Sequence, residues 1–399
     1  MADTALASPP GSAPPRPVRA GAGATAVTIA CVLPVFLVGG LAVQMSQDLR
    51  FTPTGLGLAV SVYFGISALA SVPSGALVER FGPAPVARAG ILLSAGALLA
   101  VAGLARSYPL LVVLLGLSAA ANALGQLASN AALAEHVPAR RQGLSFGVKQ
   151  AAIPVSTLLA GAAVPAIALT VGWRWAFVAA AGAALAALPA VPAAARPATA
   201  RRTTRTTGGR ATLPLLVVGA AATLAAAAAN ALGTFVVDSS VARGLAPGLA
   251  GLTLTLGSAV CVAARVGAGW LADRRAEGHV ALIAGMLVVG AVGLGLLAVA
   301  GPVPLVAGVV LGFGLGWAWP GLMNFAVVKL HPQAPAAATS ITQTGVYAGG
   351  CLGPLGLGAA AGHLGYPAMW LIGALSMLLA ATLMLTASRL LTPPRPSLH

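Results

Sequence analysis

The sequence predicts an all-α membrane protein whose twelve transmembrane helices form two pseudo-symmetric six-helix bundles. Three observations lead to this fold class: an apolar composition, a series of long apolar runs, and a repeat between the two halves of the chain. Of the 399 residues, 58% are hydrophobic and only 7% are charged. A soluble domain carries about 25% charged residues, so most of this chain's surface must contact lipid.

The apolar runs give the number of helices. A transmembrane helix needs about 20 apolar residues, because hydrocarbon tolerates only a backbone whose hydrogen bonds are satisfied internally. We expect the lipid bilayer to surround all of these runs. Twelve runs stand between polar breaks, with approximate limits of 25–47, 54–78, 85–105, 109–134, 143–169, 174–194, 213–237, 248–272, 279–300, 303–330, 338–362 and 366–391.

Polar segments divide the chain into five parts. Residues 1–24 contain five prolines and are expected to form a disordered cytoplasmic tail before the first bundle, 25–194. Residues 195–212 are basic and have no apolar period, which predicts a flexible cytoplasmic linker to the second bundle, 213–391. A second cytoplasmic tail covers residues 392–399.

The basic residues predict the orientation. Lys149 and Arg265 lie within apolar runs and fit neither side. With the N-terminus in the cytoplasm, sixteen of the other Lys and Arg residues fall on the cytoplasmic side and four on the outer side, namely Arg50, Arg106, Arg174 and Arg243. Cytoplasmic loops carry an excess of positive charge. We therefore expect an inner (plasma) membrane protein with both termini in the cytoplasm.

The two halves repeat each other at a spacing near 194 residues. Residues Gly75–Arg80 (GALVER) after the second span correspond to Gly269–Arg274 (GWLADR) after the eighth. Residues Trp173–Phe177 (WRWAF) entering the sixth span correspond to Tyr366–Trp370 (YPAMW) entering the twelfth. Duplicated halves are common in transporters, and they predict a substrate site between the halves near the membrane midplane.

Two loops of this repeat resemble a family signature. The segments GALVERFGPAPVAR (75–88) and RVGAGWLADRR (265–275) are similar to the cytoplasmic signature of the major facilitator superfamily (MFS), roughly G-x-x-x-D-R-x-G-R-R. The first loop has Glu79 in place of Asp and lacks the basic pair, and the second lacks the glycine after Arg274. The resemblance covers the whole chain in topology, charge placement and repeat, and it implies the MFS fold and a transport activity.

The resemblance also implies a gating role for these loops. In the family they brace the cytoplasmic faces of neighbouring helices and help to lock the outward-facing state. A carboxylate beside an arginine at a helix end can bond orphan backbone groups and form ion pairs that break when the halves separate. The alternative is that these charges only end the helices at the membrane interface. The residues concerned are Gly75, Glu79, Arg80, Gly82, Gly269, Asp273 and Arg274.

Two cations lie inside the predicted helices. Lys149 is about six residues into the fifth span, or roughly 9 Å deep at 1.5 Å per residue, and Arg265 lies at a similar depth in the eighth. Two cations on opposite halves could hold an anionic substrate between them, since buried ionisable groups usually face a cavity or a partner. The alternatives are that Lys149 reaches the membrane interface and that Arg265 braces a gate, as in many family members.

Polar side chains supply further candidates for the substrate site. Asn122, Gln126 and Asn130 are spaced four apart, so they share one face of the fourth span, which the family resemblance places beside the cavity. Amides also cross-link helices in membranes, and packing explains each remaining candidate at least equally well. Those candidates are Tyr63, Asn230, Trp317, Asn324, Gln343 and Tyr347.

The acidic residues weigh against two functions. All seven Asp and Glu residues fall in a tail or near helix ends. Proton-coupled carriers and carriers of cationic drugs commonly use a buried carboxylate, so both lose weight. Asp48 or Asp238 would still be placed to relay protons if the spans extended further outward.

We therefore predict a secondary active transporter that moves a small solute by alternating access, with small anions as the preferred substrate class. The alternatives are an efflux pump for a hydrophobic or neutral compound, suggested by Trp317 and Trp319, and a transporter-like membrane sensor. We expect no enzymatic activity, cofactor, metal or nucleic-acid partner, and we expect a monomer. The direction of transport, the coupling ion and the substrate's identity stay open.

Overall fold

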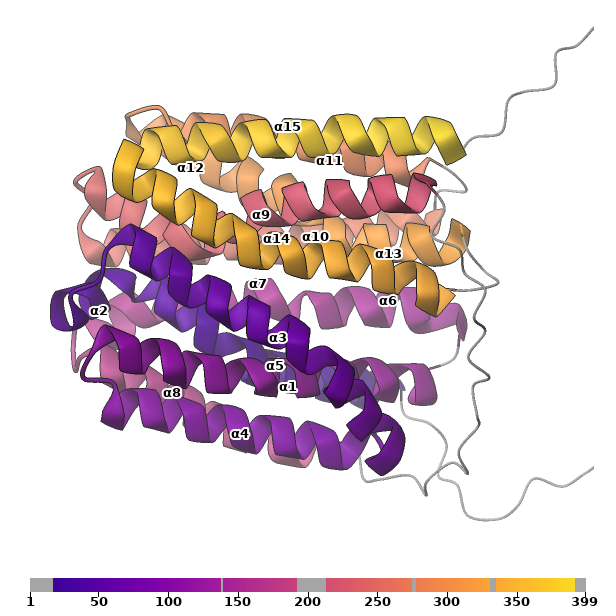
Figure 1. The fold of residues 1–399 in the computed structure, drawn as a ribbon, viewed down its shortest axis with the longest axis horizontal. Helices are drawn as coiled ribbons and strands as arrows, with labels where there is room; N and C mark the ends of the chain where they lie inside the picture. The colour runs from indigo at the N-terminus through magenta and orange to yellow at the C-terminus, as the bar shows by residue number, and fades with distance from the viewer. Residues whose placement is uncertain (1–16, 138, 192–212, 275–277, 331–334, 392–399) are drawn as a thin grey trace, which may run out of the picture.

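The fold is described by a computed structural model over residues 17–137, 139–191, 213–274, 278–330 and 335–391, in which every regular element is a helix (Figure 1). The first half contains α1 (Pro17–Gly40), α2 (Ala42–Leu49), α3 (Pro53–Phe81), α4 (Pro83–Leu104), α5 (Tyr108–His136), α6 (Ala139–Gln150), α7 (Ala152–Ala163), the π-helix η1 (Val164–Ala168), α8 (Trp173–Ala186) and the 3-10 helix η2 (Leu188–Ala190). The second half contains α9 (Leu213–Ala242), α10 (Pro247–Arg274), α11 (His279–Leu297), α12 (Pro302–Leu311), the π-helix η3 (Gly312–Gly316), α13 (Trp319–Leu330), α14 (Pro335–Leu364) and α15 (Tyr366–Leu391).

These helices make up the twelve expected spans. The first span is formed by α1 and α2, the fifth by α6, α7 and η1, and the tenth by α12, η3 and α13. Helix α1 begins at Pro17, earlier than the expected limit of residue 25. The expected linker, 195–212, and the expected tail, 392–399, lie outside the described residues.

Eleven helical stretches of the described chain are long and apolar enough to cross a membrane. Of the twelve expected spans, α14 is the one outside this set. Helix α14 has 30 residues, and it packs mainly on α9 and α3, between the two halves. Gly345, Gly349 and Gly353 follow each other at intervals of four, and a Cβ atom at each would overlap the backbone of α9. Small residues let helices approach closely in membranes, which explains why α14 is less apolar than the other spans.

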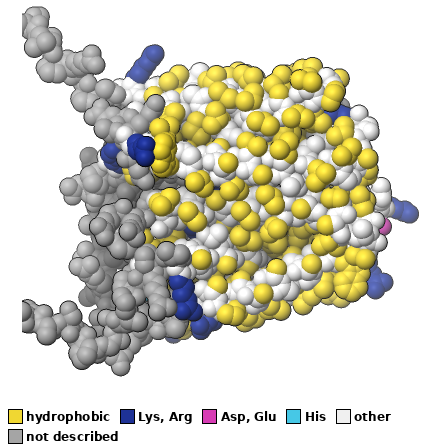
Figure 2. All heavy atoms as spheres, turned by 180° about the vertical axis from the view of Figure 1, so that it is seen from behind, with side chains coloured by type: hydrophobic (Ala, Val, Ile, Leu, Met, Phe, Trp, Pro, Cys, Tyr) yellow, Lys and Arg dark blue, Asp and Glu magenta, His cyan; other side chains and the backbone are white. Residues whose placement is uncertain are grey.

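The surface has the distribution that a membrane protein requires. Hydrophobic side chains cover the length of the face in Figure 2, and Lys and Arg lie at its two ends. Leu69 and Val303 are 79% and 76% exposed, which is costly in water but favourable in lipid. We call the end that carries Arg80 and Arg274 the signature-loop end and the end that carries Arg50 the short-loop end.

The backbone repeats between the two halves, which lie side by side in Figure 1. Gly82 follows α3 with φ of 82°, and Gly278 follows α10 with φ of 80°. Gly172 and Gly365, which precede α8 and α15, have φ of 101° and 84°. A positive φ is accessible to glycine without a steric penalty. Glycines with positive φ therefore stand at corresponding places in the two halves, although ψ is 165° at Gly82 and 17° at Gly278.

The two halves pack tightly near the short-loop end. The main contacts between them join α3 with α14 and α7 with α10. A Cβ atom at Gly57 would overlap the carbonyl oxygen of Pro354, and one at Gly161 would lie 2.6 Å from the carbonyl oxygen of Gly251. Glycine lets the backbones of the two halves touch here. The halves are therefore closed against each other at this end.

Candidate functional site

Arg265 reaches across the interface between the halves. Its side chain is 4% exposed in α10. Nη1 donates to the backbone carbonyl of Gln150 in the first half, and Nη2 donates to the carbonyl of Trp317 in its own half over 2.9 Å. Nε has no hydrogen-bond partner among the described residues. The Cys261 thiol, one turn earlier on α10, is also hydrogen-bonded with the guanidinium. Two carbonyls and a thiol therefore hold it, and no acidic side chain of the described chain forms an ion pair with it.

Lys149 precedes Gln150, the residue that Arg265 contacts, but its side chain bonds helix α5 of its own half. It is 2% exposed in α6, and Nζ donates to Gln126 Oε1 and, over 2.9 Å, to Asn130 Oδ1. The two amides are one turn apart on α5 and share one face, as the sequence predicted. Burying a charge is costly unless hydrogen bonds compensate it. The cluster meets this need within the first half, and a substrate contact for Lys149 stays a prediction.

A hollow of about 390 Å³, counted with its open mouth, adjoins Arg265. Gly147, Gly269 and Gly321 line it, and no atom of the described residues lies within 4 Å of the place where their Cβ atoms would be. Among the described residues, α6 therefore packs less closely on α10 and α13 than α7 packs on α10. The residues that line the hollow are Gly147, Gln150, Arg265, Gly269, Ala272, Gly321, Leu322 and Phe325.

A second hollow of about 320 Å³ lies inside the second half, where apolar side chains such as Leu215, Ile283 and Met323 line it. It offers no polar side chain to orient a ligand, and binding sites for small molecules usually place a few polar groups. The hollow beside Arg265 is therefore the better candidate site.

Two of the predicted ligands cross-link helices of the first half. Asn122 Nδ2 donates to Ser67 Oγ over 3.1 Å, which joins α5 to α3, while Oδ1 has no partner among the described residues. The hydroxyl of Tyr63 donates to the carbonyl of Cys31 over 3.1 Å, and the side chain is fully buried. The contacts of both residues that the structure describes are packing contacts within one half.

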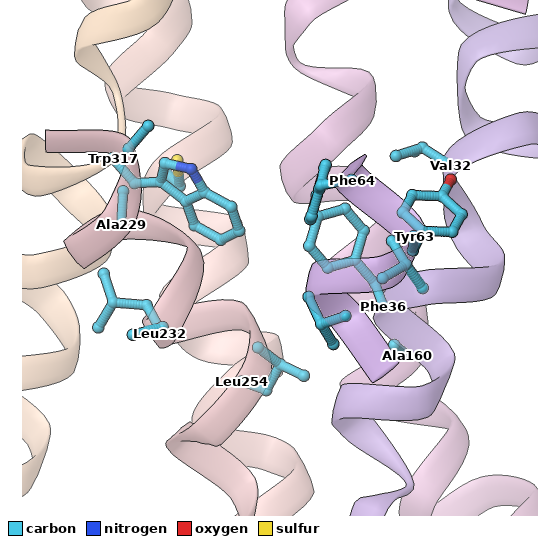
Figure 3. Packing of buried hydrophobic residues seen from close by; sticks show 14 of the residues in the cluster. Val32, Phe36, Tyr63, Phe64, Ala160, Ala229, Leu232, Leu254 and Trp317 are labelled. Carbon is cyan, nitrogen blue, oxygen red and sulfur yellow. The ribbon is translucent and has the colours of Figure 1, made fainter. Parts of the chain in front are cut away.

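Of the next three predicted residues, which belong to the second half, Trp317 contacts the first half. Trp317 is 4% exposed, and Figure 3 shows its ring directed toward Phe36 of the first half. The two ring centroids are 5.9 Å apart in an edge-to-face arrangement, and the Phe313 ring centroid lies 5.5 Å from that of Trp317. Asn230 donates to the carbonyl of Ala226 in its own helix. Asn324 Oδ1 is buried without a described partner.

Gln343 and Tyr347 form a third group on α14. The hydroxyl of Tyr347 is hydrogen-bonded with Ser71 of α3 and with Gln343. This contact links the two halves, because α3 and α14 belong to different bundles. The structure thus brings these two predicted ligands together, but at a different helix pair from Arg265.

The first signature loop is exposed. Glu79 and Arg80 are solvent-accessible, and the Arg80 guanidinium lies 5.1 Å from the centroid of the Phe81 ring. Gly82 forms the turn between α3 and α4, and Gly75 has no atom within 4 Å of a Cβ position. Glu79 takes part in no ion pair with a described residue. No contact among the described residues supports the predicted gating role of this loop, which stays a prediction.

The second signature loop has one defined contact. The Arg274 guanidinium lies 3.8 Å from the centroid of the Trp270 ring, one turn earlier on α10. A cation over an aromatic face is attracted to the ring electrons. The side chain of Asp273 lies outside the described residues, and Gly269 lines the hollow beside Arg265. The gating role of these residues stays a prediction.

Two features of the site were missed by sequence reasoning. The first is the Gln150 carbonyl that holds Arg265, for which the only signal in the sequence is Pro154. The second lies at the short-loop end, where Asp48 accepts from the Trp173 indole and from Arg174, each over 2.9 Å. The Arg174–Asp48 pair is the one ion pair among the side chains that the structure describes.

The architecture defines a class of protein. Two similar six-helix bundles with buried cations at and beside their interface have the construction of a secondary transporter. The family model of the Major Facilitator Superfamily matches residues 24–354 and 218–399, so the chain belongs to this family. Its members are transporters and are generally not enzymes. A comparison with curated proteins finds no match.

Proposed function

We propose that this transporter carries a small organic or inorganic anion by alternating access. The observation that carries the proposal is the buried guanidinium of Arg265, which contacts both halves and is held by two backbone carbonyls and the Cys261 thiol, without a described acidic partner. A buried charge usually marks a substrate route or a counter-ion site. An anion that enters the adjoining hollow would supply the missing counter-charge.

The proposed cycle follows from the packing. The halves touch at Gly57 and Gly161 near the short-loop end, while the hollow lies on the signature-loop side of these contacts. An anion would enter beside Arg265 from the signature-loop end and leave after the glycine contacts part. A single site between two rocking halves is then exposed to one side at a time.

The first test identifies the anion and then removes the cation. Purified protein is screened for thermal stabilisation by phosphate, sulfate and short carboxylates, since a bound ligand raises the apparent stability. Counterflow of the stabilising anion is then measured in liposomes. Truncating one partner of a buried charge pair costs about 2–5 kcal/mol, and 1.4 kcal/mol is tenfold. Arg265→Ala should therefore raise KM roughly thirtyfold or more.

Arg106→Ala is the matched control, because Arg106 is an exposed arginine in the loop between α4 and α5. It removes the same charge without touching the interface and should leave counterflow unchanged. Equal counterflow by the Arg265→Ala variant and the unchanged protein would reject the proposal.

We propose that the signature-loop end faces the cytoplasm of an inner (plasma) membrane, with both termini inside. The positive-inside bias supports this orientation. Cysteines introduced at the exposed positions Arg88 and Arg106, in a background without native cysteines, would be treated with an impermeant maleimide on intact cells. Labelling at residue 106 alone is expected. Labelling at residue 88 alone would reverse the orientation.

The second candidate function is export of a hydrophobic or neutral compound. The edge-to-face pair of Phe36 and Trp317 spans the interface, and Phe64 lies near it in Figure 3. Aromatic rings supply large apolar contact area. Cells expressing Trp317→Ala should then accumulate hydrophobic dyes like cells without the protein, while Arg265→Lys should retain export. An anion carrier should instead keep transport of its anion in Trp317→Ala and lose it in Arg265→Lys.

A further inference from the structure

The fifth span is broken at Ala151, between α6 and α7. Pro154 in the first turn of α7 has no N–H, so the carbonyl of Gln150, four residues earlier, loses the hydrogen bond of a regular helix. The neighbouring bonds are intact: Ala151 N–H donates to Gly147 over 3.1 Å and Val155 N–H to Ala151 over 3.0 Å. Gln150 therefore presents a free carbonyl that its own helix cannot satisfy.

Arg265, in the other half of the protein, donates a hydrogen bond to this free carbonyl. Nη1 bonds Gln150, which is 115 residues away in the chain. Nη2 bonds the carbonyl of Trp317, which lies in the break between η3 and α13. One guanidinium therefore joins two interrupted helices, one from each half. A guanidinium suits this position because its donors are held in a fixed planar fork.

A second proline shows a different arrangement. Pro34 inside α1 frees the carbonyl of Ala30 in the same way, and the hydroxyl of Ser94 donates to it over 2.6 Å. Ser94 is neutral and belongs to the same half, so this bond does not change when the halves move. The bond between Arg265 and Gln150 crosses the halves and occupies Nη1, one of the donors that an anion would use.

We propose that Pro154 is a positioning residue: the carbonyl it frees at Gln150 holds Arg265 until a substrate anion displaces it. This inference rests on the proposed anion transport and adds how the anion acts. The anion and the Gln150 carbonyl compete for one guanidinium. Anion binding therefore releases the link between the halves at the hollow, and loss of the anion restores it.

Pro154→Ala tests the competition. Alanine restores the N–H, and the helix draws the Gln150 carbonyl back toward its axis. The readout that needs no transport is the labelling rate of a Gly147→Cys probe in the hollow, in a cysteine-free background. A hydrogen bond to a charged group contributes about 1.5 kcal/mol, and 1.4 kcal/mol is tenfold. The labelling rate should thus rise by roughly tenfold in Pro154→Ala. In the protein that keeps Pro154, saturating phosphate, sulfate or acetate should also raise the labelling rate.

Counterflow supplies the second readout. Without the competing carbonyl, the exchanged anion should bind more tightly, so KM should fall by up to about tenfold. The turnover number should fall as well, because the halves no longer close on Arg265. A proline with a merely structural role would raise KM or lower the yield of folded protein instead.

Pro73→Ala is the matched control. Pro73 also lies inside a helix, but its ring is exposed and the carbonyl it frees at Leu69 accepts from no described side chain. This variant should leave labelling and KM unchanged. Unchanged labelling in Pro154→Ala, or a raised KM, overturns the inference while leaving anion transport intact. Normal counterflow in Arg265→Ala overturns the proposed function itself.

Discussion

The hydroxyl of Tyr366 donates a hydrogen bond to the carboxylate of Asp238, which ties the first residue of α15 to α9. The first half has the same arrangement, in which the indole of Trp173 at the start of α8 donates to Asp48. In each half an arginine also donates to a backbone carbonyl just after a helix end. Arg174 donates to Ala105 after α4, and Arg243 donates to Val299 after α11.

Tyr366→Phe should destabilise the second half. The change leaves the half-buried carboxylate of Asp238 without its described donor, and an unsatisfied buried group costs about 1–3 kcal/mol. The apparent melting temperature in detergent should fall. Tyr108→Phe, which removes a hydroxyl that donates to the neutral carbonyl of Gly55, should have the smaller effect. Equal melting temperatures for both variants would contradict the prediction.

Stability should depend on pH through Asp48. The hydrogen bonds that Asp48 accepts from Trp173 and from Arg174 lower its pKa below the ordinary value of 3.8. A lowered pKa in the folded state stabilises the protein above the unfolded pKa, and this contribution is lost as the pH falls through the folded value. Asp48→Asn should therefore melt earlier than the unchanged protein at pH 7 and no earlier at pH 2. A constant difference across this range would refute the assignment.

Gly57→Ala should weaken closure at the short-loop end. The added methyl group overlaps the carbonyl of Pro354 only while the two halves touch. Overpacking costs about 1–3 kcal/mol, so counterflow should slow by roughly fivefold or more. Gly96→Ala is the control, because no atom of the described residues lies within 4 Å of its Cβ position. Equal counterflow in the two variants would show that the halves do not close at Gly57.

Asn130→Ala should be rescued by a second substitution. Lys149 loses an acceptor when Asn130 is truncated, and a buried charge that is poorly bonded costs more than the neutral side chain that replaces it. The single variant should therefore melt earlier than the unchanged protein. Adding Lys149→Met should restore part of the loss. A double variant less stable than Asn130→Ala would show that Lys149 does not depend on this amide.

The architecture was readable from the sequence because bilayer thickness sets the length of each apolar run. The broken helices were not, since Gly312–Gly316 lies inside a continuous apolar stretch and Pro154 was the one signal beside the break at Ala151. The shared face of Gln126 and Asn130 followed from their spacing. Their contact with Lys149 did not, because side-chain direction depends on how α5 and α6 pack.

The position of Arg265 illustrates the same limit. Its depth in the eighth span was predictable by counting residues from the loop. Its partners were not, because they are backbone carbonyls 115 and 52 residues away rather than side chains that a residue type would reveal. Composition therefore located the buried charge, and tertiary packing decided what it contacts.

The glycine-rich composition of α14 has a consequence for biogenesis. A segment enters the bilayer on its own only if its apolar side chains outweigh the cost of its polar ones. The other spans meet the length and composition criterion that α14 does not, yet its partners α3 and α9 are both synthesised before it. We therefore expect the integration of α14 to depend on its packing against α3 and α9 as well as on partitioning into lipid.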